Sequence, residues 1–336
     1  MHSLARLGLA TAALVCLVSA AVGQAPTPKE QRTMDVPQLT ISNDVLKLTL
    51  YLPDAEKGYY RGTRFDWSGM IARAEFQGRT VFGPFRTKFE PTLHDHVVGP
   101  AEEFDIDGPA GYAEAKVGEP FMKIGVGLIE KVQEDKYGFW NRYKLAKPGP
   151  WKVTSGKDWV EFEQELALGG YGYVYTKRIT LKGPGFTLAH TLRNTGTKAI
   201  DTVTYCHNFT IIDDEPVGPG YRVVLPFKAG LGPNSKPAEA EVRDSAIAFR
   251  DVVKGSVMLF LDGLTGGAAD NAATIENTRT GTALKLKGDR PLVKYNFYAE
   301  KTAACPEPFV RIRVAPGKQE EWATEYTIMA GPKNAQ

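Results

Sequence analysis

Histidine is scarce in this chain, which makes each imidazole a useful marker for proton-transfer chemistry near neutral pH. Of the five histidines, four follow residue 24: His94, His96, His190 and His207. In the segment 203–211, every second residue shares the parity of His207, and these neighbours are aromatic or β-branched. We expect a β-strand with His207 in the middle of one face. The imidazole is then either a satisfied core residue or a proton-transfer group at the floor of a cleft.

A carboxylate late in the chain has the rigidity that a general base requires. Glu307 lies between Pro306 and Pro308. The proline rings fix their own φ angles and restrict the residue between them. A positioned carboxylate of this kind can accept a proton from a substrate hydroxyl. The alternative is an ordinary exposed glutamate in a loop, which describes most glutamates.

The remaining histidines are less informative. His94 and His96 form an H-x-H pair, whose imidazoles lie on one side of an extended segment at a spacing that a metal ion can use. No third ligand is indicated, so we expect no metal. The alternative is one exposed histidine and one that hydrogen-bonds a partner. Few polar residues lie near His190 in sequence, and we expect a structural role for it.

An aromatic and arginine-rich segment, 59–69, precedes these histidines. It includes Tyr59, Tyr60, Arg64, Asp66 and Trp67. Aromatic rings can stack on the C–H face of a sugar while arginine and aspartate hydrogen-bond its hydroxyls. The same composition suits a strand edge whose arginines pair with carboxylates, and the segment alone favours that structural interpretation.

Alternating polar and apolar residues dominate the rest of the chain and predict β-strands. Turn residues between paired runs indicate three hairpins, over 70–82, 151–166 and 173–192. No segment has a helical period longer than about three turns. Many short strands separated by turns predict an all-β chain, folded as a sandwich or a barrel. The irregular segment 85–119 is expected to be a long loop, and such loops are usually functional or disordered.

The first residues do not belong to the fold. A positive residue, an apolar run and small residues before Gln24 are typical of a secretory signal over 1–23, followed by a linker over 24–34 and one β-sandwich domain over 35–332. We therefore expect a periplasmic or secreted protein. No other long apolar run exists, so no membrane partner is expected after cleavage.

The net charge of +2 gives no reason to expect nucleic acid, and a monomer is the simplest expectation. Cys206 and Cys305 could form one disulfide.

Taken together, these segments resemble the galactose mutarotase-like (aldose 1-epimerase) superfamily. The motif 205–209, which contains His207, is similar to the family's histidine on a central strand. The motif 305–308, which contains Glu307, is similar to its late glutamate motif. The family's opening strands and its closing Pro-Gly turn and strand resemble 62–79 and 314–328. The resemblance spans most of the chain after residue 34 and implies a large antiparallel β-sandwich, the galactose mutarotase-like supersandwich.

The resemblance also implies a reaction and a set of site residues. In such enzymes a glutamate takes the proton of the anomeric hydroxyl while a histidine protonates the ring oxygen, so Glu307 would be the base and His207 the acid. His96, or else His94, would hydrogen-bond the sugar. Further sugar contacts would come from Arg64, Trp67 and Asp262. No metal and no organic cofactor is implied.

Three classes of function stay open at this point. The first is an exported aldose 1-epimerase-like isomerase that acts on a mono- or oligosaccharide. The second is a non-catalytic carbohydrate-binding protein, because a fold does not determine a function. The third is a glycan lyase or hydrolase that uses the same cleft. The aromatic cluster of Tyr59, Tyr60 and Trp67 would serve the second and third classes equally.

Overall fold

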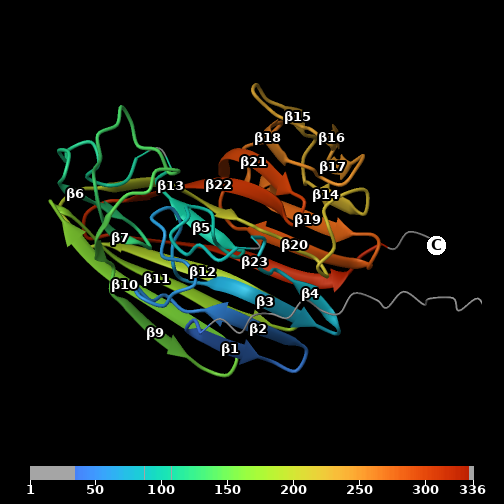
Figure 1. The fold of residues 1–336 in the computed structure, drawn as a ribbon, viewed down its shortest axis with the longest axis horizontal. Helices are drawn as coiled ribbons and strands as arrows, with labels where there is room; N and C mark the ends of the chain where they lie inside the picture. The colour runs from blue at the N-terminus through green and yellow to red at the C-terminus, as the bar shows by residue number, and fades with distance from the viewer. Residues whose placement is uncertain (1–34, 87, 107, 333–336) are drawn as a thin grey trace, which may run out of the picture. The chain divides into compact units, whose positions relative to one another are not determined.

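The computed structural model describes residues 35–86, 88–106 and 108–332. The predicted secretory signal, 1–23, and the linker, 24–34, lie outside these residues. The described residues form antiparallel strands and one short 3-10 helix, η1 (Ala268–Asp270), which confirms the all-β prediction (Figure 1). In these ranges, no helix has the length and apolar character needed to cross a membrane.

Most strands belong to two large sheets (Figure 1). The order in the ten-stranded sheet is β16 (Ala240–Arg243), β17 (Ala246–Phe249), β14 (Tyr221–Val224), β19 (Ala272–Asn277), β20 (Thr282–Gly288), β23 (Gln319–Ala330), β12 (Gly185–Asn194), β11 (Tyr171–Lys182), β10 (Trp159–Leu168) and β9 (Trp151–Ser155). The order in the six-stranded sheet is β15 (Gly230–Leu231), β18 (Ser256–Asp262), β21 (Leu292–Glu300), β22 (Ala304–Val314), β13 (Ile200–His207) and β5 (Ala101–Phe104).

Two smaller sheets complete the described fold. One contains β1 (Gln38–Ser42), β2 (Leu46–Tyr51), β3 (Met70–Phe76) and β4 (Arg79–Val81). The other contains β6 (Pro120–Lys123), β7 (Gly127–Glu130) and β8 (Leu145–Pro148). The three predicted hairpins are present as β3–β4, β9–β10 and β11–β12. Gln77 and Gly78 both have positive φ, 49° and 76°, which gives the β3–β4 turn the twist that a two-residue hairpin needs.

The two large sheets pack against each other through aromatic and aliphatic side chains. The ring of Phe104 on β5 lies 5.3 Å from that of Tyr175 and 6.2 Å from that of Trp322, both on the ten-stranded sheet. Residues of alternate parity along a strand point to opposite faces. His207 and Glu307 therefore point away from this core, on what we call the outer face of the six-stranded sheet.

A cluster of charged side chains lies inside the core. Lys177 Nζ is 2.6 Å from Asp66 Oδ2 and 3.2 Å from Glu102 Oε2, and His190 Nε2 is 2.6 Å from the same Glu102 oxygen. Burial disfavours the ionised carboxyl of Glu102, but the charges of His190 and Lys177 outweigh it and lower its pKa to about 2. These contacts support the predicted structural role of His190, which links the ten-stranded sheet to β5.

Strand boundaries near the candidate residues differ from the prediction in three places. β13 ends at His207, because the Phe209 amide donates to the His207 carbonyl at 2.9 Å and turns the chain out of the sheet. Ile211 is therefore not on the strand. β22 begins at Ala304, so Glu307 lies inside a strand and not in a loop. The predicted long loop 85–119 contains β5, which pairs with β13.

The two cysteines do not form the disulfide that the sequence allows. Cys206 and Cys305 are both buried and free. The pairing of Tyr205 with Phe309 places Cys206 on the inner face of the six-stranded sheet and Cys305 on its outer face. Burial raises the pKa of both thiols, which makes them poor nucleophiles.

Candidate active site

His207 and Glu307 meet on the outer face of the six-stranded sheet. β13 and β22 pair antiparallel up to Tyr205 and Phe309, and two further residues in this register set His207 opposite Glu307. His207 Nε2 is 3.0 Å from Glu307 Oε1, and the two residues are 5% and 3% exposed. The fold thus brings the two predicted catalytic side chains, one hundred residues apart in sequence, into direct and buried contact.

The imidazole of His207 is oriented by packing. It stacks on Phe209 with ring centroids 3.8 Å apart and planes 5° from parallel. Tyr298 meets it edge-on at 5.3 Å and Phe65 at 6.0 Å. Its Nδ1 has no hydrogen-bond partner among the described residues. Aromatic rings rather than a second hydrogen bond therefore fix the imidazole with Nε2 toward Glu307.

The prolines beside Glu307 occupy positions where a strand tolerates them. The pairing of β13 with β22 stops at Phe309, so Pro306 and Pro308 lie beyond it and deprive that pairing of no amide donor. Asn208 takes the place of the missing strand, since its side-chain amide donates to the Pro306 carbonyl at 2.8 Å. Glu307 itself pairs with Asn296 on β21. Its backbone is therefore held on both sides.

Arg64 lies beside this pair but is fully engaged by other groups. Its Nε donates to Glu103 Oε2 at 2.8 Å, and its guanidinium also donates to the Tyr205 hydroxyl at 2.8 Å. The rings of Phe65 and Phe139 contact the guanidinium at 4.4 and 3.9 Å. Burial disfavours its charge, but Glu103 and Tyr205 outweigh burial and raise the pKa of Arg64. Arg64 is a permanent cation with its own counter-ion.

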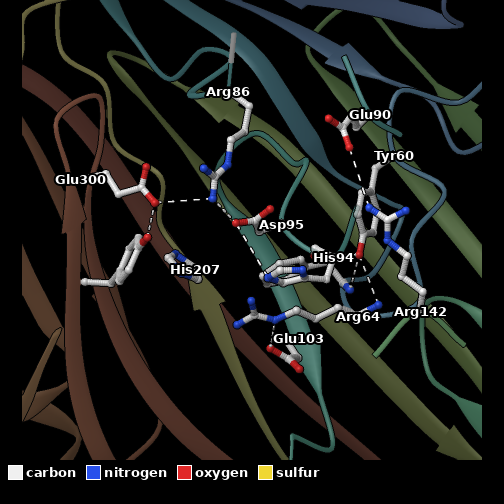
Figure 2. Close-up of polar contacts among 12 residues, drawn as sticks. Tyr60, Arg64, Arg86, Glu90, His94, Asp95, Glu103, Arg142, His207 and Glu300 are labelled. Carbon is white, nitrogen blue, oxygen red and sulfur yellow. Dashed lines mark hydrogen bonds and ion pairs between the residues drawn. The ribbon is translucent and has the colours of Figure 1, made fainter. Parts of the chain in front are cut away.

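Four polar side chains, which we call the polar rim, lie around His207 in Figure 2: Arg86, His94, Asp95 and Glu300. Arg86 pairs with Asp95 and lies 3.4 Å from Glu300 Oε1. His94 Nε2 is 3.8 Å from Asp95 Oδ2. The rim side chains are between 14% and 34% exposed, whereas those of His207 and Glu307 are 6% and 4% exposed.

Tyr298 connects the polar rim to the buried pair. Its hydroxyl hydrogen-bonds the Glu300 carboxylate, and its ring meets His207 edge-on.

Burial lowers the pKa of His94, an effect that the charge of Asp95 opposes. His94 is therefore neutral at neutral pH and can both donate and accept a hydrogen bond.

Three predicted sugar-binding residues lie outside this arrangement. His96 is buried, stacks on Tyr59 at 4.9 Å and accepts the Glu90 amide at Nδ1. Trp67 is buried, and its Nε1 donates to the Gly62 carbonyl at 2.8 Å. Asp262 is exposed at the end of β18, on the same face as Glu307 but two strands away.

Several residues of the site were not identified from the sequence. They are Arg86, Asp95, Glu103, Phe139, Tyr298 and Glu300. The first three fall in 85–119, whose His, Asp and Glu content was the available signal. Tyr298 and Glu300 lie at the end of β21 and share its outer face with Asn296, a pattern that becomes informative only once the pairing of β21 with β22 is known.

No group of three or more His, Cys, Asp and Glu residues is placed to hold a metal ion in the described ranges. His94 and His96 contact different neighbours, Asp95 and Phe139 for the former and Tyr59 and Phe89 for the latter. The chemistry available from the described side chains is that of a carboxylate, an imidazole and fixed hydrogen-bonding groups.

Solved structures with the same architecture identify the fold. The Slr1438 protein from Synechocystis sp. PCC 6803 gives a TM-score of 0.56 at 12% identity, covering 89% of this chain and 98% of its own. An Escherichia coli K12 protein, provisionally assigned as an aldose 1-epimerase, gives 0.56 at 15% identity, covering 88% and 99%. A galactose mutarotase-like protein from Lactobacillus casei ATCC 334 gives 0.52 at 12% identity, covering 87% and 100%.

The fold of this chain follows from these similarities. No family model matches the sequence, and no curated protein matches it either. The structural similarity extends over nearly the full length of the three solved chains, so this chain has the galactose mutarotase-like β-sandwich fold. The predicted fold class is confirmed. At these identities the similarity shows the fold alone.

Proposed function

We propose that the protein is an exported aldose 1-epimerase-like sugar isomerase, with Glu307 as the general base and His207 as the general acid. One observation carries this proposal: the 3.0 Å contact between His207 Nε2 and Glu307 Oε1 on the outer face of the six-stranded sheet. The structural similarity to aldose 1-epimerase-like proteins supports it. The substrate class is a mono- or oligosaccharide with a free anomeric carbon.

The geometry of a cyclic sugar explains why the acid and the base must lie side by side. The anomeric hydroxyl and the ring oxygen are bonded to the same carbon atom. A base that takes the hydroxyl proton and an acid that protonates the ring oxygen therefore act on adjacent atoms. The side chains of His207 and Glu307 lie in contact, so both can reach two oxygens of one carbon atom. Their surroundings exclude most water, which strengthens hydrogen bonds to the reacting oxygens.

The proposed reaction conserves both protons. Glu307 accepts the proton of the anomeric hydroxyl while His207 donates one to the ring oxygen, and the bond between the anomeric carbon and the ring oxygen breaks. Rotation about the C1–C2 bond presents the other face of the aldehyde. On closure, His207 recovers its proton from the attacking hydroxyl and Glu307 returns its proton to the anomeric oxygen. The opposite anomer leaves, and both side chains regain their starting states.

A specific observation also favours a non-catalytic carbohydrate-binding protein. His207 and Glu307 contact each other while both are nearly buried, which is an arrangement that a purely structural pair would also adopt. In that case the polar rim would bind a sugar without opening its ring. The two functions differ in a single measurable property, the rate at which one anomer converts to the other.

Polarimetry on freshly dissolved α-glucose and α-galactose, extended to a panel of aldoses, tests the proposal. We expect the protein to accelerate the change in rotation, and we expect Glu307→Gln and His207→Asn to abolish the acceleration. Glu163→Gln, a half-exposed glutamate on β10, is the matched control. Binding of sugars without acceleration for any aldose would replace the isomerase by the binding protein, and release of products from a polysaccharide would indicate a lyase or hydrolase.

Export is a separate part of the proposal. It rests on the composition of residues 1–23, and it places the mature protein in the periplasm or outside the cell. Sequencing the N-terminus of the natural mature protein tests it. A start near Gln24 is expected, whereas a mature chain that begins at Met1 would contradict export through this segment.

A further inference from the structure

The most exposed large apolar side chain in the described residues belongs to Trp140. Its exposed fraction is 57%, in a protein whose other aromatic residues are mostly buried. Trp140 lies in the connection between β7 and β8, within a segment rich in aromatic residues. Single exposed apolar side chains need no explanation. Trp140, however, packs on Phe139, a residue that contacts two side chains of the candidate active site.

The segment around Trp140 is fixed by several contacts. The Asn141 amide donates to the Gly138 carbonyl at 2.9 Å, closing a turn, and the Gly138 amide donates to the Tyr143 hydroxyl at 3.0 Å. Glu134 accepts hydrogen bonds from Tyr143 at 2.8 Å and from the Asn141 side chain at 2.7 Å. These contacts lie on both sides of Trp140, so the loop presents the indole in a defined position.

The indole of Trp140 packs against Gly138. A Cβ atom at this position would lie 3.0 to 3.2 Å from three atoms of the Trp140 ring, so the indole rests directly against the glycine backbone. The ring of Phe139 meets the indole at 4.9 Å in an edge-on arrangement. The indole is therefore supported from one side while more than half of its surface stays open to solvent.

Phe139 connects this indole to the candidate active site. Its ring lies 3.9 Å from the Arg64 guanidinium carbon and 6.3 Å from the ring of His94, a member of the polar rim. Arg64 in turn hydrogen-bonds Tyr205, two residues before His207 on β13. The open indole thus contacts Phe139, whose ring in turn contacts Arg64 and lies near His94.

The charges around the pair indicate a neutral ligand. The Arg64 guanidinium is paired with Glu103, and the Arg86 guanidinium is paired with Asp95 and lies close to Glu300. Both arginines beside the pair therefore have carboxylate partners, and a phosphate or a carboxylate on the ligand would have to displace one of them. A neutral sugar is the ligand that suits this balance.

We infer that the site takes a neutral oligosaccharide, with its reducing-end sugar at His207 and Glu307 and the next sugar ring stacked on Trp140. This inference rests on the proposed function for the placement of the reducing end. An aromatic face supplies apolar contact to the C–H face of a sugar ring, and a rigidly held ring does so with little loss of entropy. Trp140 is then a specificity-determining residue that favours disaccharides and longer chains over monosaccharides.

The test compares glucose and galactose with maltose, cellobiose and lactose, using wild-type protein, Trp140→Ala and Trp140→Phe. We expect the wild type to show a lower KM for at least one disaccharide than for its monosaccharide. Trp140→Ala should raise the KM for that disaccharide about tenfold relative to the KM for the monosaccharide, and Trp140→Phe should recover most of this loss. Trp159→Ala, a tryptophan on β10 in the ten-stranded sheet, is the control and should change neither KM.

A binding measurement separates this inference from the proposed function. Calorimetric titration with the same sugars reports affinity whether or not the anomers interconvert. If no sugar is isomerised but a disaccharide binds through Trp140, the proposed function fails and the stacking site stands. If Trp140→Ala changes the affinity for disaccharides and monosaccharides equally, or if no disaccharide binds more tightly than its monosaccharide, the inference is overturned even where isomerase activity is present.

Discussion

Tyr205 donates a hydrogen bond of 2.6 Å to Glu103 across the pairing of β13 with β5, and the same carboxylate oxygen accepts Arg64 Nε at 2.8 Å. Glu103 is the partner that keeps the buried Arg64 charge compensated. Glu103→Gln should therefore lower the free energy of unfolding by about 3–5 kcal/mol, the cost of leaving a buried charge unpaired. Urea denaturation at pH 7 measures it.

The control for this change is Asp201→Asn. Asp201 also accepts arginine donors, from Arg311 and Arg313, but all three side chains are more than two-fifths exposed. Exposed pairs contribute at most about 1 kcal/mol. Equal losses in the two variants would show that the Glu103 pair has no special role in the fold.

The acid–base pair predicts a large and shared loss of activity. His207→Asn and Glu307→Gln should each lower kcat for anomer interconversion by about 100-fold or more, because each removes one of two proton transfers on adjacent oxygens. The double variant should be little slower than either single variant, since the two residues act as a unit. Polarimetry over a range of sugar concentrations separates kcat from KM. A single variant that keeps wild-type kcat would remove that residue from the mechanism.

Ionisation of Asp105 should make the free energy of unfolding depend on pH near neutrality. Burial raises the pKa of this carboxyl from 3.8 to about 6 in the folded protein. The folded state therefore disfavours its ionised form, so its contribution to stability is complete below about pH 4 and is lost as the pH rises through 6. Asp105→Asn stays neutral and should gain about 2–3 kcal/mol at pH 8 but little at pH 4.

Asparagine also tolerates the backbone of this position, where φ is 55°. Asp214→Asn is the matched control, because Asp214 has a similar φ of 56° with a side chain that is 68% exposed. Thermal denaturation at the two pH values distinguishes the variants. A stabilisation of Asp105→Asn that is the same at pH 4 and pH 8 would contradict an ionisation effect.

Glu102 should control stability at low pH. Its pKa is lowered from 4.5 to about 2 in the folded protein, so its contribution is present above about pH 4.5 and is lost as the pH falls toward 2. This shift corresponds to a loss on the order of 3 kcal/mol over that range. Glu102→Gln should be less stable than wild type at pH 7, and the difference should shrink as the pH falls. A difference that stays constant with pH would exclude the ionised carboxylate as its cause.

The strand content was predictable because alternation and turn residues are local signals. The hairpin at Gln77 and Gly78 is an example, since the turn chemistry and the flanking pattern agree. His207 was placed on a strand for the same reason. The end of β13 at His207 was not predictable, because Phe209 continues the alternation while its amide turns back to the His207 carbonyl.

The partners of the candidate residues were harder to predict, because they depend on pairing between distant segments. Glu307 was singled out by its flanking prolines, but its contact with His207 came only from a family resemblance. Glu103 lies on β5, a strand of four residues whose side chains are all buried and therefore show no alternation. Its role depends on two neighbours, Arg64 and Tyr205, that lie 39 and 102 residues away in sequence.

The separation between β13 and β22 has a consequence for how the protein acquires its site. The two strands pair across about one hundred residues, and β5 joins them from a further hundred residues upstream. Long-range pairings of this kind form late in folding, because a large loop must lose conformational entropy before any contact between its ends stabilises the chain. No fragment that ends before β22 contains both halves of the His207–Glu307 contact. The site therefore forms only when the sheet is complete.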